Sequence, residues 1–159
     1  MLGERRELVA RNRCADLSHA NVVLGVDEDA AADSSAAGSV TLYDAQRPYH
    51  AANLRLAQLV QRDVLASVSA DGTVVPNLGV HNDVGYGDLA SAGAQAYGHL
   101  TLLGPPKRGY LDTPTLVPAA LIEPLFLTNP SEASLADSAA GQEAIAHGLA
   151  NAAEQFLGR

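Results

Sequence analysis

Short apolar runs and longer segments with helical spacing follow one another along the chain. The apolar runs predict four strands, at residues 21–26, 38–43, 99–103 and 117–123. Apolar positions that recur every three or four residues predict two helices, at residues 49–69 and 138–157. The segment 3–20 is polar but rich in good helix formers, with some apolar residues available for one face, and it also predicts a helix. A further helical segment opens at Asn129, with Pro130 in its first turn, where the missing N–H of proline costs nothing.

The order of these elements predicts the fold class. Strands that alternate with helices are typical of an α/β fold with a mostly parallel sheet flanked by helices. The Gly-rich stretch 77–98 has no clear period, and we expect a loop with one short helix there. No linker or internal repeat divides the 159 residues, so we expect a single domain spanning 1–159.

Composition excludes several classes of function. Ten Lys and Arg against eighteen Asp and Glu give a net charge of −8, which argues against a nucleic-acid partner. No apolar run approaches the roughly 20 residues of a membrane span. Cys14 is the only cysteine, so an internal disulfide and a multi-cysteine zinc site are excluded. We expect Cys14 to be a packing residue at the boundary of its helix.

The first thirteen residues are charged throughout and contain no apolar segment of the kind found in a secretory signal peptide. Two interpretations follow. Either the protein is cytoplasmic, or sequence upstream of this chain is missing.

The most unusual local feature is Glu123, a carboxylate at the C-terminal end of an apolar strand. Ligands of open α/β sheets bind at that end of the strands. Partial burial by Leu125 and Phe126 would raise the pKa of Glu123 toward the range useful for general acid–base catalysis. The alternative is a carboxylate that caps a neighbouring helix or pairs with an Arg.

A second candidate site is the acidic cluster that directly follows the first strand, made of Asp27, Glu28, Asp29 and Asp33. Carboxylates at a strand end can converge on a metal ion. Like charges at this density are also typical of a solvated loop, and both interpretations stay open.

The five histidines show no metal-ligand spacing such as the HExxH helix pair. His81 shares a predicted loop with Asp83 and Asp88, which makes it a candidate ligand or proton carrier. We expect His99, next to a predicted strand, to have a structural role, and His147 to be a surface or boundary residue.

One motif carries a family resemblance. Glu123, Phe126 and Asn129 have the spacing Glu-x-x-Phe-x-x-Asn at the end of a late strand. In this motif, and in the order of the earlier elements, the chain resembles the zinc-dependent N-acetylmuramoyl-L-alanine amidases of type 3. The earlier elements match only as patterns: Arg11-Asn12 with Ala15-Asp16 in the first helix, the strand ending at Val26, the strand 38–43, and residues 53–60.

The resemblance implies a function. Such amidases hold zinc with two His and one Glu, and they cleave the amide bond between the muramoyl lactyl group and L-alanine. By resemblance, Glu123 carries the proton of the metal-bound water, Asn129 fixes the following turn and Phe126 packs beneath it. The resemblance also implies zinc as cofactor, peptidoglycan or muropeptides as substrate, and an extracellular or cell-envelope location.

The chain departs from the family pattern in two ways. The family's first His and its metal-binding Glu lie in a strand and helix without a counterpart here, so we expect a partial domain whose sheet has an exposed edge. The second His position is Asp27, which is the metal ligand that we predict in this chain.

Three functional hypotheses remain. The first is a peptidoglycan amidase with Glu123 as its catalytic carboxylate. The second is a catalytically inactive amidase-like domain that binds cell wall or regulates a partner. The third is an unrelated small α/β hydrolase that uses His81. The sequence does not fix the oligomeric state.

Overall fold

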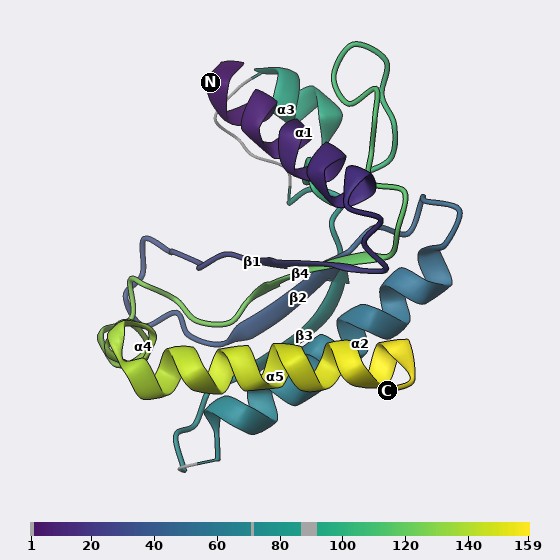
Figure 1. Ribbon diagram of the computed structural model, residues 1–159. Coiled ribbons are helices and arrows are strands. Elements are labelled where there is room, and N and C mark those ends of the chain that lie inside the picture. Colours follow the sequence, from purple (N-terminus) through teal and green to yellow (C-terminus); the bar gives the residue numbers. More distant parts are fainter. Residues whose placement is uncertain (1, 71, 87–91) are drawn as a thin grey trace.

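The computed structural model describes residues 2–70, 72–86 and 92–159, which form a four-stranded sheet with helices on both sides. Helices α2 and α5 cover one face of the sheet, and α1 and α3 lie beyond the other face (Figure 1). The elements in chain order are α1 (Leu2–Leu17), β1 (Val23–Val26), β2 (Ser39–Tyr43), α2 (His50–Val68), β3 (Asn77–Asn82), α3 (Ala92–Tyr97), β4 (Ala119–Glu123), α4 (Pro130–Asp137) and α5 (Ala139–Leu157).

The strand order is β1-β4-β2-β3. Strands β1 and β4 pair in parallel, as do β2 and β3, and only the central pairing of β2 with β4 is antiparallel. Two of the three pairings are therefore parallel, which confirms the predicted α/β class with a mostly parallel sheet. The antiparallel pairing places the C-terminal ends of β1 and β4 at one end of the sheet and those of β2 and β3 at the other.

Strand β3 was not predicted, because a β-bulge hides its pattern. Ser39 pairs with Asn77 but Val40 pairs with Gly79, so Leu78 is an extra residue on β3. Gly79 has φ +92°, a conformation that glycine adopts without strain. The bulge leaves Leu78 42% exposed and breaks the apolar alternation that would identify a strand.

The strand predicted at residues 99–103 is wrong. The chain turns there, since the N–H groups of Leu103 and Gly104 both donate to the carbonyl oxygen of Leu100. Its leucines pack on the face of the sheet, against Val40 and Leu42, instead of joining it. The apolar run therefore reflects burial and not strand pairing.

The main core lies between the sheet and the α2–α5 pair, where apolar side chains of α2, β4 and α5 are buried. The two helices approach closely at Gly148, since a Cβ atom added there would lie 2.5 Å from the Cα of Val64. Ser138 caps α5 by accepting from the N–H of Gly141. Cys14 is exposed on α1, so its predicted packing role is wrong: α1 is a polar helix that buries little of its surface. Within the described residues, no helix has both the length and the apolar character needed to cross a membrane.

Candidate active-site edge

Strands β1 and β4 end side by side. Val26 pairs with Ile122, and the N–H of Asp27 donates to the carbonyl oxygen of Ile122 at 3.0 Å. Asp27 and Glu123 are therefore adjacent at the C-terminal ends of two parallel strands. We call this end of the sheet, with Asp27, Glu28, Asp29 and Glu123, the acidic edge.

The alternation of side chains along β1 and β4 places the carboxylates of Asp27 and Glu123 on the same face of the sheet. On β4, Ala120 and Ile122 pack into the core beneath α2 and α5, whereas Ala119 and Leu121 face the opposite side. Glu123 continues the second set, because successive side chains of a strand point to opposite faces. Asp27 continues the corresponding set on β1, which contains Val23.

Burial sets the protonation of this edge. Desolvation is the main cause, and the negative charges of Asp29 and Asp27 add to it; together they raise the pKa of Glu123 to about 7. The sequence predicted this raised pKa, and the structure has it. Desolvation also raises the pKa of Glu28 to about 7, helped by Asp27 and Glu132 and opposed by a hydrogen bond from the backbone of Leu125.

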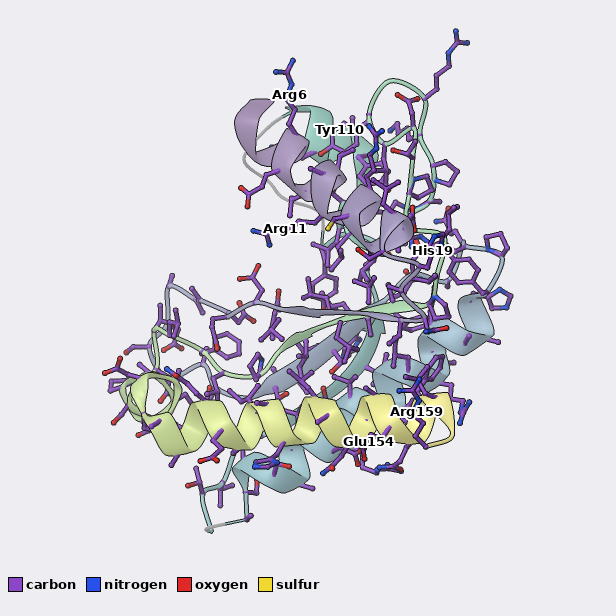
Figure 2. The ribbon with its side chains drawn as sticks, viewed as in Figure 1. Arg6, Arg11, His19, Tyr110, Glu154 and Arg159 are labelled. Atoms are coloured by element: carbon purple, nitrogen blue, oxygen red, sulfur yellow. The ribbon has the colours of Figure 1, made fainter. Side chains whose placement is uncertain are left out.

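No cation neutralises the acidic edge among the described residues. The ion pairs of the described residues all involve carboxylates outside the acidic edge. On α1, Arg11 pairs with Glu7 of its own helix, and Arg6 points away from the sheet (Figure 2). The caps of α2, α4 and α5 are other residues, so within the described part of the chain Glu123 neither caps these helices nor pairs with an Arg.

The loop after Glu123 is held by backbone and side-chain hydrogen bonds. The N–H of Asp29 donates to the carbonyl oxygen of Leu125, and the carbonyl oxygen of Asp29 accepts from the N–H of Leu127. The buried carboxylate of Glu132 accepts from the N–H groups of Gly38 (2.8 Å) and Phe126 (2.7 Å). These bonds join the loop after β1 to the loop after β4, so the acidic edge is a preorganised unit.

Two residues of the Glu-x-x-Phe-x-x-Asn motif support this loop. Asn129 caps α4, where its side-chain oxygen accepts from the N–H groups of Ser131 and Glu132. Phe126 is 8% exposed. The place of Asn129 agrees with the resemblance, which implied that this residue fixes the following turn.

A stability measurement tests the raised pKa of Glu28. Because the folded state holds this proton more tightly than the unfolded chain, Glu28 lowers stability as pH rises from 4.5 to about 7. We expect Glu28→Gln to gain stability over the wild type at pH 8, by about 1–2 kcal/mol after allowance for solvent screening. At pH 4 the two proteins should be nearly equal.

Urea unfolding at the two pH values checks this, with Glu143→Gln on the exposed surface of α5 as the matched control. A gain of the same size at pH 4 and pH 8 would contradict the raised pKa.

The acidic edge does not by itself fit a catalytic zinc ion. Such an ion takes three protein ligands, usually with at least one His. The edge offers only carboxylates, and within the described residues only one group of three His, Cys, Asp or Glu side chains converges closely enough to hold an ion. That group lies elsewhere, so Asp27 stays a predicted ligand without partners.

The converging group consists of Asp44, Asp83 and His99, which we call the buried triad. Asp44 follows β2 and Asp83 follows β3, so the triad lies at the opposite end of the sheet from Glu123. The Nδ1 atom of His99 is 3.0 Å from Asp83 Oδ1 and 3.2 Å from Asp44 Oδ2. Burial raises the pKa of Asp83 to about 6, against the lowering effect of His99.

The sequence missed this triad. Its members are widely separated along the chain, and only the pairing of the unpredicted β3 with β2 brings Asp83 beside Asp44. Asp83 contacts His99 and not His81, whose exposed ring contacts the carbonyl of Leu78 at 2.8 Å. Asp88, the other predicted neighbour of His81, lies outside the described residues. His99 is buried and hydrogen-bonded, as expected of a structural residue.

A family model described as N-acetylmuramoyl-L-alanine amidase matches residues 3–155. The chain belongs to this amidase family. No curated protein sequence matches the chain. Solved amidase structures share its fold at low sequence identity, and the chain spans less than two thirds of the length of those compared below.

Three of these amidase structures illustrate the likeness. The catalytic domain of CwlV from Bacillus (Paenibacillus) polymyxa var. colistinus is 18% identical with a TM-score of 0.66, over 95% of this chain and 65% of that one. An amidase from Clostridium difficile 630 is 23% identical with the same TM-score and coverage. The CwlD amidase from Clostridioides difficile, solved with the GerS lipoprotein, is 22% identical with a TM-score of 0.61, over 99% of this chain and 61% of that one.

Proposed function

We propose that this amidase domain hydrolyses the amide bond between N-acetylmuramic acid and L-alanine in peptidoglycan, with Glu123 as the group that transfers the proton. Family membership supports the reaction, and the observation that carries the role of Glu123 is its place in the acidic edge with a pKa of about 7. From this substrate class we infer that the domain acts outside the cell or in the cell envelope.

Glu123 is suited to both halves of the hydrolysis. As a carboxylate it takes a proton from the water whose oxygen attacks the lactyl carbonyl carbon. As the carbon–nitrogen bond breaks, the same carboxyl group gives that proton to the leaving nitrogen of L-alanine. A pKa near 7 lets one group accept and donate at neutral pH. The products are a lactyl carboxyl group and a free peptide amine.

The surrounding carboxylates support this role. Asp29 and Asp27 raise the proton affinity of Glu123 by their negative charge. Glu132 accepts hydrogen bonds from Gly38 and Phe126, and these bonds fix the loops after β1 and β4. The acidic edge therefore needs little reorganisation when substrate binds. Zinc, which the family resemblance implies, would require ligands besides Asp27 at this edge.

A second candidate function is favoured by the composition of the acidic edge. Asp27 stands where the family pattern has a metal-binding His, and the other described side chains at this edge are carboxylates. An edge without a metal could still bind a muropeptide without cleaving it. The second candidate is therefore a non-catalytic module that binds cell wall.

Purified disaccharide-peptide muropeptides, incubated with the protein with and without added Zn²⁺, distinguish the two functions. We expect mass spectrometry to detect free stem peptides that begin with L-alanine, released at least about 100-fold more slowly by Glu123→Gln. Muropeptide binding is measured in parallel by calorimetry. Binding without release under either condition would favour the non-catalytic module, and absence of both binding and release would contradict both proposals.

A further inference from the structure

Three buried side chains converge at the end of the sheet opposite Glu123. Asp44 and Asp83 are both 0% exposed and His99 is 9% exposed. One ligand atom from each lies within 4.8 Å of the other two. The parallel pairing of β2 and β3 sets the two carboxylates side by side, and the segment after α3 brings His99 onto them.

The hydrogen bonds leave one oxygen of each carboxylate for this centre. Asp44 Oδ1 accepts from the N–H groups of Gln46 and Arg47, each at 2.8 Å. Asp83 Oδ2 accepts from the N–H of Leu100 at 3.0 Å. The remaining atoms, Asp44 Oδ2 and Asp83 Oδ1, both face His99 Nδ1.

The single Nδ1 atom of His99 cannot satisfy both oxygens well. It makes a hydrogen bond with Asp83, and Asp44 Oδ2 is buried without a hydrogen-bond partner. An unsatisfied buried carboxylate oxygen is costly, because it has lost its water and gained nothing in return. Asp44 Oδ2 therefore points to a ligand between the three side chains.

The cationic side chain next to Asp44 does not fill this role. The buried guanidinium of Arg47 donates to the carbonyl oxygens of Leu102, Gly104 and Thr115, at 3.0 to 3.1 Å. Within the described part of the chain, the ion pairs of Asp44 and Asp83 are with His99 and not with Arg47. A cation bound between the three side chains would therefore neutralise carboxylate charge that Arg47 does not contact.

We propose that the buried triad binds a divalent cation of the zinc class at a site separate from the acidic edge. One imidazole nitrogen and two carboxylate oxygens are ligands that zinc accepts, at about 2.0–2.2 Å. Tetrahedral ligands at that distance are about 3.3–3.6 Å apart. The 3.0 and 3.2 Å separations of the two carboxylate oxygens from His99 Nδ1 are slightly shorter, so a small outward shift of the side chains would admit the ion. One position remains for a small exogenous ligand.

Two neighbours suit this role. The Gln46 amide nitrogen lies 3.3 Å from His99 Nε2. With Nδ1 on a metal, Nε2 carries the proton, and the Gln46 amide turned over would present Oε1 to accept it, as the outer partner of a metal-bound His does. His99 also begins the turn whose leucines cover the sheet at Val40 and Leu42. An ion here would fasten that turn to the ends of β2 and β3.

The site is distinct from the edge that carries Glu123. Val40 pairs with Glu123, and Asp44 is four residues further along the same strand direction. At about 3.3 Å per residue, this separates the two along the sheet by about 13 Å. An ion held by the triad therefore contacts neither Glu123 nor Asp27.

Metal analysis tests the proposal without reference to activity. The protein is stripped with a chelator, dialysed against Zn²⁺ and analysed for bound metal. We expect one equivalent in the wild type and in the matched control Asp27→Asn, and none in Asp44→Asn. Saturating Zn²⁺, about 100-fold above Kd, should raise Tm by about 5–10 °C in the wild type but not in Asp44→Asn.

No bound Zn²⁺ in the wild type would overturn the proposal, as would an ion retained by Asp44→Asn and lost from Asp27→Asn. The first result would mean that hydrogen bonds alone hold the triad, and the second that the ion lies at the acidic edge. X-ray absorption by the wild-type zinc complex decides the matter if Asp44→Asn does not fold. One imidazole with oxygen ligands is expected, and a sulfur ligand or two imidazoles would overturn the assignment.

Discussion

Glu123→Gln is expected to slow release of the stem peptide by about 10²- to 10⁴-fold, the usual contribution of a positioned acid–base group. Glutamine keeps the shape of the side chain but can neither take the proton from water nor return it to the leaving amine. Initial rates of peptide release, followed by chromatography of the freed amine, measure the effect.

The pH dependence gives the same proposal a second readout. Only ionised Glu123 accepts a proton, so the wild-type rate should rise with pH through about 7, where this carboxyl group titrates. The residual rate of Glu123→Gln should lack that rise. A pH profile unchanged by the substitution would mean that another group sets it.

A matched control for this substitution is Glu154→Gln. Glu154 is an exposed carboxylate on α5, near the C-terminus of the chain (Figure 2). It lies on a helix that covers the face of the sheet opposite to the one Glu123 faces. We expect its rate to stay within about twofold of the wild type, since surface changes rarely matter. A wild-type rate in Glu123→Gln itself would exclude proton transfer by Glu123.

Gly148→Leu is expected to lower the free energy of unfolding by about 3 kcal/mol or more. A Cβ atom at this position would lie 2.5 Å from Val64 Cα and 2.8 Å from the carbonyl oxygen of Asp63. Both atoms belong to the backbone of α2 and cannot turn aside as a side chain could. The two helices would have to separate, which opens the core between them.

Urea denaturation followed by circular dichroism measures this loss. Ala150→Leu, at an exposed position on the same helix, is the matched control and should change stability by less than about 0.5 kcal/mol. A change below about 1 kcal/mol in Gly148→Leu would show that α2 and α5 can shift apart without breaking their packing.

Local pattern was enough to predict much of the fold. The apolar stripes of α2 and α5 and the apolar runs of β1, β2 and β4 each bury a face of their own element, so their period is visible in the sequence. The place of Glu123 at the end of β4 follows from its neighbours along the chain. Its raised pKa could be predicted for the same reason, because the residues beside it are apolar.

Other features depend on residues that are distant in sequence. The bulge at Leu78 removes the alternation by which β3 would be recognised, and the run 99–103 is apolar because it covers the sheet. Without β3, nothing places Asp83 beside Asp44, and without the turn nothing brings His99 to them. The sequence by itself determined α2, α5, three strands and the carboxylate at the end of β4, because each depends on a local pattern of apolar residues. Only the tertiary structure decided the buried triad, because a convergence of three separate segments leaves no spacing to detect.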